Sequence, residues 1–248
     1  MAICTKEFFI PDDGIRLHAK LDRPEGAKQC PLVIVLHGFT GHMEERHILA
    51  VSGAMNELGY ATLRVELYGH GQSDGKFEDH NLYKWLNNVL AVTDYAKRLD
   101  FVTDLYLCGH SQGGLTTMLA AGMMPEIFKA ILPLSPAIAI LDGARAGTLL
   151  GMTFDPANMP ETISFNDRRL RDSYVRVAQT LHVEEAIRRY KGPVLLVHGD
   201  ADEAIPIRDT IAAAEQYENA KLVVIHGDTH CYDRHLDEVV AAVKEFLS

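Results

Sequence analysis

The pattern Gly-x-Ser-x-Gly occurs twice in this sequence, and each copy could present a serine hydroxyl as a nucleophile. One copy occupies residues 109–113 around Ser111, and the other occupies residues 71–75 around Ser73. The flanking glycines of this pattern allow a sharp turn between a strand and a helix, which leaves the hydroxyl exposed. Backbone N–H groups at the start of that helix can stabilise a developing oxyanion. The chemistry to expect is therefore acyl transfer through a serine.

The surroundings of the two serines favour Ser111 as the nucleophile. An apolar run at residues 105–108 precedes Ser111 and an apolar helical pattern at residues 115–124 follows it, which predicts a strand, a turn and a helix. The polar residues 76–80 that follow Ser73 begin no helix. The second copy is therefore predicted to be a glycine-rich structural loop after a strand.

A serine hydroxyl becomes a good nucleophile only when a histidine accepts its proton and a carboxylate orients that histidine. In alternating strand and helix folds the partners follow the serine in the order acid, then histidine, each after a later strand. The loop after the apolar run 193–197 contains three carboxylates, Asp200, Asp202 and Glu203. All three have the required chemistry, and we favour Asp202 as the acid.

The histidine base is expected in the loop after the last predicted strand, residues 221–225. His226 adjoins this strand, His230 lies within the loop, and His235 falls in a predicted last helix over residues 232–247. The loop position favours His230. Most of the other histidines, out of 12 in the chain, are expected to be surface or structural residues.

The oxyanion formed in such a reaction needs two N–H donors. The first is the backbone N–H of Gln112, the residue after the proposed nucleophile, and the second comes from the loop after an early strand. Residues 36–41 form such a loop directly after the apolar run 32–36. The backbone N–H of Phe39 in this loop is the candidate for the second donor.

Apolar runs that alternate with helical patterns predict an α/β fold with a mostly parallel sheet and helices on both faces. The chain opens with two predicted antiparallel strands around a Pro-Asp-Asp-Gly turn. Predicted strands cover residues 5–10, 15–21, 32–36, 60–67, 105–108, 129–134, 193–197 and 221–225, and predicted helices cover residues 47–58, 81–99, 115–124, 207–217 and 232–247.

Residues 136–190 interrupt this alternation. No buried strand is evident there, and Asp-Gly, Asp-Pro and Met-Pro pairs punctuate the segment. Long insertions in a compact domain usually carry lids or binding loops, so we expect a cap over the C-terminal edge of the sheet. An irregular surface excursion is the alternative. The chain is thus expected to be a single domain, residues 1–248, with a cap insertion at about residues 136–190.

The charge and the apolar pattern exclude several classes of partner. The formal net charge of -10 disfavours binding to nucleic acid and to an anionic membrane surface. No apolar stretch reaches the roughly 18 residues of a membrane span, and the first residues lack the pattern of a secretion signal. We therefore expect a cytoplasmic protein with no nucleic-acid and no membrane partner.

The four cysteines of the chain fit neither a metal site nor a nucleophile. None forms a C-x-x-C pair or a metal-ligand spacing, so we predict no metal, and the expected chemistry needs no organic cofactor. Cys108 falls inside a predicted strand as a small buried residue. Cys231 is next to His230 in the sequence, where side chains rarely face each other. A reducing compartment fits this cysteine usage.

Five segments in order resemble the α/β-hydrolase superfamily over essentially the whole chain. The resemblance implies that Asp202 and His230 complete the triad and that Ser73 belongs to a structural loop. Glu66 stands where that superfamily often has an aspartate before its glycine-rich loop, and we expect the difference to affect loop structure rather than chemistry. The segments are His-Gly-Phe at 37–39, Gly-His-Gly-Gln-Ser at 69–73, Gly-His-Ser-Gln-Gly at 109–113, His-Gly-x-x-Asp at 198–202 and Gly-x-x-His at 227–230.

Within that superfamily the sequence resembles the bacterial cinnamoyl (feruloyl) esterases. The length, the short insertion, Leu-Ser-Pro-Ala at 134–137 and Asp-Thr-His-Cys at 228–231 are similar. The small cap of those enzymes holds the phenolic end of a hydroxycinnamate. The resemblance implies that Asp142 and Tyr174 are hydrogen-bond partners for the ring hydroxyls, and the alternative is that both are ordinary surface residues of the cap.

We therefore expect a serine esterase that hydrolyses hydroxycinnamate esters by two-step acyl transfer, with a small-molecule ester as its partner. The same triad would suit a monoacylglycerol lipase, a short-chain carboxylesterase or a thioesterase, and the cap residues decide among them. The non-enzyme alternative is a binding protein that has the hydrolase fold without activity, and a complete triad argues against it. The sequence does not determine the oligomeric state, and a homodimer is possible.

Overall fold

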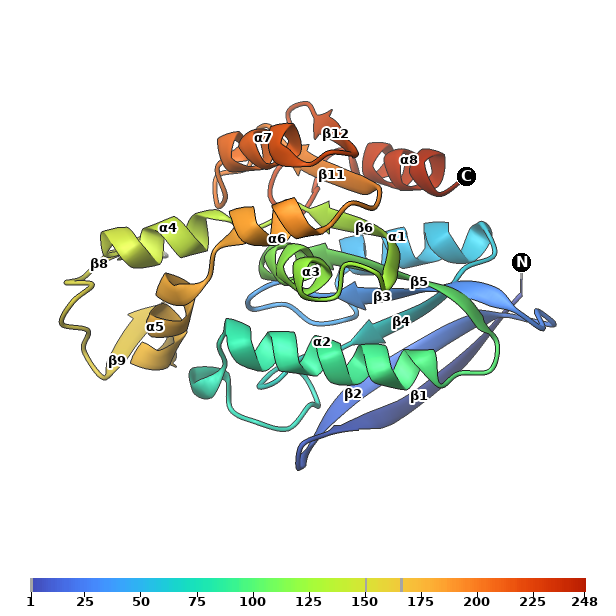
Figure 1. The fold of residues 1–248 in the computed structure, drawn as a ribbon, viewed down its shortest axis with the longest axis horizontal. Coiled ribbons are helices and arrows are strands. Elements are labelled where there is room, and N and C mark those ends of the chain that lie inside the picture. Colours follow the sequence, from blue (N-terminus) through green and yellow to red (C-terminus); the bar gives the residue numbers. More distant parts are fainter. Residues whose placement is uncertain (1, 150, 166) are drawn as a thin grey trace.

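An eight-stranded sheet forms the centre of the protein (Figure 1). The computed structural model describes residues 2–149, 151–165 and 167–248. In order across the sheet the strands are β1 (Ile3–Asp12), β2 (Ile15–Pro24), β4 (Ala61–Val65), β3 (Cys30–Leu36), β5 (Val102–His110), β6 (Phe128–Leu134), β11 (Val194–Gly199) and β12 (Ala220–Ile225). The β1–β2 and β2–β4 pairs are antiparallel, and all other neighbouring pairs are parallel. This confirms the predicted antiparallel start and mostly parallel sheet.

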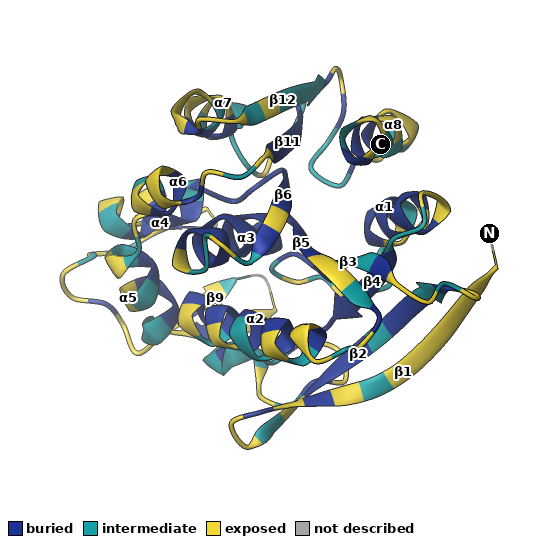
Figure 2. Ribbon diagram, turned by 45° about the vertical axis from the view of Figure 1, so that its right-hand side comes forward, coloured by how far each residue is buried: buried dark blue, intermediate teal, exposed yellow. Residues whose placement is uncertain are grey.

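Helices cover both faces of this sheet (Figure 2). They are α1 (Arg46–Glu57) and α8 (Leu236–Leu247) on one face, and α2 (Leu82–Lys97), α3 (Gln112–Met123) and α7 (Ile207–Gln216) on the other. In β3, Val33 and Val35 join the core beneath α1 and α8, whereas Leu32, Ile34 and Leu36 join the core on the opposite face. This is the period-two alternation of a strand buried on both sides. No helix in the described ranges has the length and apolar composition needed to cross a membrane.

The loop before α8 is longer than expected, so the predicted helix start at residue 232 is wrong. Tyr232 has a left-handed φ of 57°, which a helix does not accommodate. The buried carboxylate of Asp228 accepts the N–H groups of Arg234 and His235 at 3.0 and 3.1 Å. Asp228 therefore holds the segment around His230 in a turn, and His235 precedes the helix instead of lying within it.

The segment between β6 and β11 forms helices and short hairpins, most of which lie at the left of Figure 1. Its elements are α4 (Ala139–Ala146), β7 (Thr148–Leu149), β8 (Met152–Thr153), β9 (Thr162–Phe165), β10 (Arg168–Arg171), α5 (Asp172–Thr180) and α6 (Val183–Arg189). Among the described residues these four strands form two separate hairpins, β7–β8 and β9–β10. The guanidinium of Arg145 donates to the carbonyl oxygens of Gln179 and Leu181 and so joins α4 to the end of α5.

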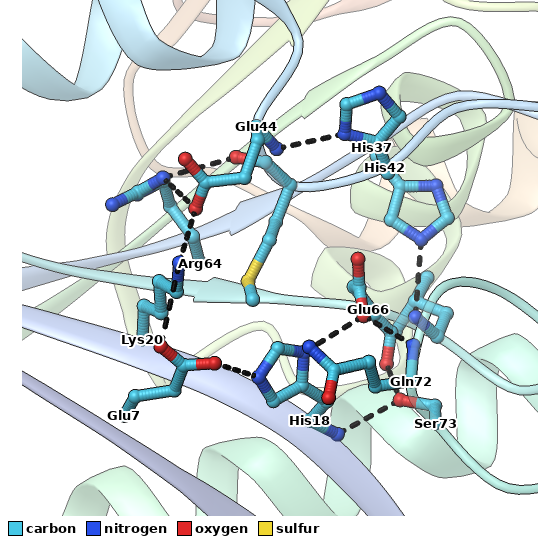
Figure 3. A network of polar contacts seen from close by, with 12 residues as sticks. Glu7, His18, Lys20, His37, His42, Glu44, Arg64, Glu66, Gln72 and Ser73 are labelled. Atoms are coloured by element: carbon cyan, nitrogen blue, oxygen red, sulfur yellow. Dashed lines mark hydrogen bonds and ion pairs between the residues drawn. The ribbon is translucent and has the colours of Figure 1, made fainter.

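A network of polar side chains holds the glycine-rich loop after β4 against β1 and β2 (Figure 3). Glu66 Oε2 lies 2.8 Å from Nδ1 of His18 and accepts the N–H of Gln72 at 2.6 Å. The other ring nitrogen of His18 lies 2.6 Å from Oε1 of Glu7. Ser73 Oγ accepts the N–H of His18 at 2.8 Å and donates to the carbonyl oxygen of Glu66 at 2.5 Å. The hydroxyl of Ser73 therefore makes hydrogen bonds that hold the loop against β2, in agreement with its expected structural role.

Replacing Glu66 by alanine should destabilise the protein by about 3 kcal/mol, because it removes a buried carboxylate and leaves the donors of His18 and Gln72 without a partner. The midpoint of urea unfolding, followed by circular dichroism, measures this loss. Glu7→Ala removes the exposed partner of His18 and should lower the midpoint less. Equal midpoints for Glu66→Ala and the wild type would show that the network does not stabilise the fold.

Candidate active site

Ser111 occupies the sharp turn between β5 and α3, with a φ of 57° and a ψ of -119°. A backbone conformation of this kind costs a residue other than glycine about 1–3 kcal/mol. Its N–H donates to the carbonyl oxygen of Leu134 at 2.9 Å, and its carbonyl oxygen accepts the N–H of Ala137 at 3.0 Å. A Cβ at Gly113 would lie 2.4 Å from the carbonyl oxygen of His37. The second glycine of the motif thus lets α3 pack directly against the loop after β3.

Asp202 lies in the loop after β11, with 0% of its side chain exposed. Its Oδ1 accepts the N–H groups of Ala204 and Ile205 at 2.9 and 2.8 Å, and its Oδ2 accepts Nδ1–H of His230 at 2.7 Å. Burial raises the pKa of Asp202, but hydrogen bonds from His198 and His230 outweigh burial and hold the pKa well below its usual range. Asp202 is therefore ionised at neutral pH, and it orients His230 with Nε2 free to accept a proton.

A second aspartate–histidine pair joins the same two loops at the surface. Asp200 Oδ2 lies 2.8 Å from Nδ1 of His226, whose side chain is 86% exposed. Glu203 is exposed to solvent. By contrast, the side chain of His230 is 21% exposed. Of the three acid candidates Asp200, Asp202 and Glu203, only Asp202 has a buried side chain that is hydrogen-bonded to a histidine.

His110, the residue before Ser111, joins the serine turn to the histidine loop. Its Nε2 lies 2.8 Å from the carbonyl oxygen of His230, and the two ring centroids are 4.7 Å apart. Burial lowers the pKa of His110 well below its ordinary value, so its ring is neutral and Nε2–H donates to that carbonyl. Among the described residues, His230 is hydrogen-bonded to Asp202 but not to Ser111 Oγ. Such contacts in hydrolases often tighten only when substrate binds.

The orientation of the loop after β3 is determined by His37. Burial lowers the pKa of His37 well below its ordinary value, so its ring is neutral. Nε2 accepts the N–H of Leu67 at 3.0 Å, which leaves the proton on Nδ1 to donate to the carbonyl oxygen of Gly38 at 2.7 Å. Because the C=O and N–H of one trans peptide point in opposite directions, this bond turns the N–H of Phe39 away from the His37 ring.

The two expected oxyanion donors lie on segments that contact each other at the serine. Gln112 begins α3, where the first N–H groups have no partner within the helix. A Cβ at Gly38 would lie 3.2 Å from the Cβ of Ser111, so the loop that carries Phe39 touches the serine turn. The segments that carry the two expected donors therefore meet at the serine turn.

The two residues proposed to bind ring hydroxyls lie in different surroundings. Tyr174, on α5, is buried, and its hydroxyl donates to Oε1 of Gln112 at 2.6 Å. Asp142, on α4, has 82% of its side chain exposed and accepts from Arg145 at 2.9 Å. It borders a cleft of about 430 Å³ whose lining includes Ile205, three residues after Asp202. The structure thus places Tyr174 against the oxyanion segment and Asp142 beside the acid loop.

A cluster of aromatic rings around Phe39 was not evident in the sequence. The Phe39 ring lies 5.4 Å from Phe77, 5.3 Å from His80, 5.7 Å from Phe165 and 5.6 Å from Tyr174, measured between centroids. These residues come from four separate segments, so no spacing along the chain could reveal them. The cluster places aromatic surface beside the oxyanion segment, and two of its members belong to the insertion.

The two cysteines considered as nucleophiles carry their protons at neutral pH. Burial raises the pKa of Cys108 to about 12 and that of Cys231 to about 11. A thiol reacts through its thiolate, so neither residue is activated. Within the described part of the chain, no group of three or more His, Cys, Asp or Glu residues is arranged to hold a metal ion.

The sheet, the serine turn and the loops after β11 and β12 define an α/β-hydrolase. Residues 27–177 match the family described as serine aminopeptidase, S33, and residues 165–248 match the family described as TAP-like protein. The chain belongs to the serine aminopeptidase S33 family, whose match covers more than half of it.

Similar proteins include a solved structure with high sequence identity. Est1E from Butyrivibrio proteoclasticus, in a structure with ferulic acid bound, is 59% identical and has a TM-score of 0.95, with 97% of each chain covered. The palmitoyl-protein thioesterase ABHD10 of Pongo abelii is 25% identical over 212 residues, which cover 80% of this chain and 66% of that protein. The match thus spans just under two thirds of that relative. The same fold is found in mouse α/β hydrolase domain-containing protein 10. That structure is 19% identical and has a TM-score of 0.79, with 98% of each chain covered.

Replacing Asp202 by asparagine should lower kcat for ester hydrolysis by about 10⁴-fold, because an amide at this position favours the wrong tautomer of His230. Initial rates with p-nitrophenyl butyrate, at equal concentrations of folded protein, measure the loss. Asp200→Asn is the matched control, since it alters the exposed pair with His226, and it should keep wild-type activity. Full activity in Asp202→Asn would show that another residue is the acid.

Proposed function

We propose that this protein hydrolyses esters of hydroxycinnamic acids through an acyl-enzyme on Ser111. Ser111 Oγ attacks the ester carbonyl while Nε2 of His230 takes its proton, and Asp202 stabilises the resulting imidazolium. The backbone N–H groups of Phe39 and Gln112 bind the oxyanion. His230 gives the proton to the departing alcohol, and water then releases the acid from Ser111 by the same two steps.

The observation that carries this proposal is the buried hydrogen bond between Asp202 and His230, in a loop that His110 ties to the serine turn. A buried, ionised carboxylate that orients a part-exposed histidine is the arrangement needed for proton transfer from a serine. The exposed pair of Asp200 and His226 offers the same chemistry without burial or contact with that turn.

The aromatic cluster around Phe39 supports an aromatic acyl group. A planar ring attached to Ser111 through an acyl group would meet ring surfaces, which stabilise aromatic groups through edge and face contacts. The ferulic acid bound in the structure of Est1E, which is 59% identical to this chain, supports the same class of acid. A long aliphatic acyl chain would gain less from these rings than a cinnamoyl group.

Residues 136–190 act, in this proposal, as a cap on a single domain that spans residues 1–248. Tyr174 donates its hydroxyl proton to Gln112, which leaves oxygen lone pairs that can accept from a phenolic hydroxyl. Asp142 is the second proposed partner and would exchange its bond with Arg145 for one with substrate. The substrate is a small-molecule ester, and the reaction needs no cofactor. The cytoplasmic location stays a prediction.

The purified protein should cleave methyl ferulate with a kcat/KM about tenfold above that for methyl butyrate, which has the same leaving group, because only the feruloyl group contacts the aromatic cluster. Ser111→Ala should lose both activities and its labelling by a fluorophosphonate. A preference for butyrate would replace the aromatic class with a general esterase, and a preference for a palmitoyl thioester would replace it with a thioesterase. Full activity in Ser111→Ala would show that the nucleophile is wrong.

Tyr174→Phe should lower kcat/KM for methyl ferulate about tenfold and change the value for p-nitrophenyl butyrate much less, because only ferulate has a phenolic hydroxyl to lose a partner. Steady-state kinetics on both esters measure the difference. An equal loss on both esters would show that Tyr174 acts through Gln112 and not through the ring hydroxyl.

A further inference from the structure

His198 is a buried side chain that contacts the proposed catalytic acid. It lies in β11, near the end of that strand, and its side chain is fully buried. Its Nε2 lies 3.1 Å from Oδ2 of Asp202 and 3.2 Å from the carbonyl oxygen of Ile205, while its Nδ1 lies 2.7 Å from Oγ1 of Thr210. Both neighbours of Nε2 can only accept, so Nε2 carries a proton, and the hydroxyl of Thr210 is the hydrogen-bond partner of Nδ1.

Two histidines therefore share one oxygen of the acid. Oδ2 of Asp202 receives Nδ1–H of His230 at 2.7 Å and lies 3.1 Å from the Nε2 of His198, while Oδ1 receives two backbone N–H groups. The contact from His198 fixes the rotation of the carboxylate and takes part of the negative charge on Oδ2. How firmly Asp202 holds the imidazolium of His230 depends on that share of charge.

We propose that His198 is a positioning residue for the reaction, which orients Asp202 through its Nε2–H and is itself held in place by Thr210. The chain of contacts runs from Thr210 on α7 through His198 and Asp202 to His230. This inference rests on the triad of the proposed function. It assigns to the histidine of the His-Gly-x-x-Asp segment a role distinct from that of the base.

Loss of this donor has a defined effect on the pH dependence of the reaction. A carboxylate with one donor fewer is a stronger base, so the pKa of Asp202 rises and the carboxylate binds the protonated form of His230 more tightly. The base then gives up its proton only at higher pH, and the acidic limb of the kcat/KM profile moves upward. Other titratable and charged groups lie around this pair of residues. They are Glu45, Arg46 and His47 at the start of α1, His110 at the end of β5, and Cys231, Tyr232 and Asp233 in the histidine loop.

Three variants test the proposal with p-nitrophenyl butyrate as the substrate, so that the result does not depend on the acid that the enzyme prefers. His198→Phe keeps a ring and removes the donor, His198→Gln places an amide N–H near the position of Nε2, and Thr210→Val leaves the ring but removes the hydroxyl that bonds its Nδ1. His226→Phe is the matched control, because His226 also bonds an aspartate of the acid loop but does so at the surface. Rates are expressed per active site, as titrated with a fluorophosphonate.

His198→Phe should lower kcat about 10- to 100-fold with KM within about twofold of the wild type, the size of effect usual for residues that orient a site residue. Its acidic limb should move to higher pH. His198→Gln should recover most of the rate, Thr210→Val should show a smaller loss and shift in the same directions, and His226→Phe should match the wild type.

Wild-type kcat and an unshifted acidic limb in His198→Phe would overturn the proposal, as would equal losses in the Phe and Gln variants. If His198→Phe does not fold, Thr210→Val decides, and unchanged rate and pH dependence in that variant also overturn the proposal. Asp202→Asn is measured in parallel. Full activity in Asp202→Asn would mean that the triad itself is wrong, which separates failure of the proposed function from failure of the role of His198.

Discussion

The strained backbone of Ser111 is the constraint on which the rest of the site depends. A residue other than glycine remains at this φ only when its surroundings determine it, and here the neighbouring strand β6 and the segment after it bond both its N–H and its C=O. Close approach of Gly113 to the carbonyl oxygens of Leu36 and His37 then fixes the distance between the serine turn and the oxyanion loop. One turn thus aligns the carboxyl ends of β3, β5 and β6, the central strands of the sheet.

Buried neutral histidines hold much of this alignment. His37 bonds the carbonyl of Gly38, His80 that of Phe77, and His110 that of His230. Burial lowers the pKa of His80 to about 3 and takes those of His37 and His110 well below their ordinary values, so these rings are uncharged at neutral pH. Neutral rings can bond backbone carbonyls without adding positive charge that would compete with the protonated form of His230, the proposed base.

The sequence predicted the order of elements and the loops that carry the site, because strand periodicity and the serine turn are local patterns. Loop position and the family resemblance favoured Asp202 over Asp200 and His230 over His226, but the spacing alone could not show which pair is buried, because both aspartates follow the same strand and both histidines follow the next one. The distinction lies in burial, which depends on the packing of α7 and on the turn that Asp228 and Tyr232 impose on the histidine loop. Those contacts leave no periodic signal in the chain.

The insertion was the least predictable part for the same reason, and its contacts bear directly on specificity. Phe165 and Tyr174 from the insertion pack on the side chain of Phe39, and Tyr174 also bonds the side chain of Gln112. Phe39 and Gln112 are the two residues whose backbone N–H groups are the proposed oxyanion donors. Their side chains contact the insertion, and in the proposed function their amides hold the oxyanion, so an acyl group that moves the aromatic cluster would also move the proposed oxyanion donors. The proposed function therefore couples selection of the acid to stabilisation of the oxyanion through the same two residues.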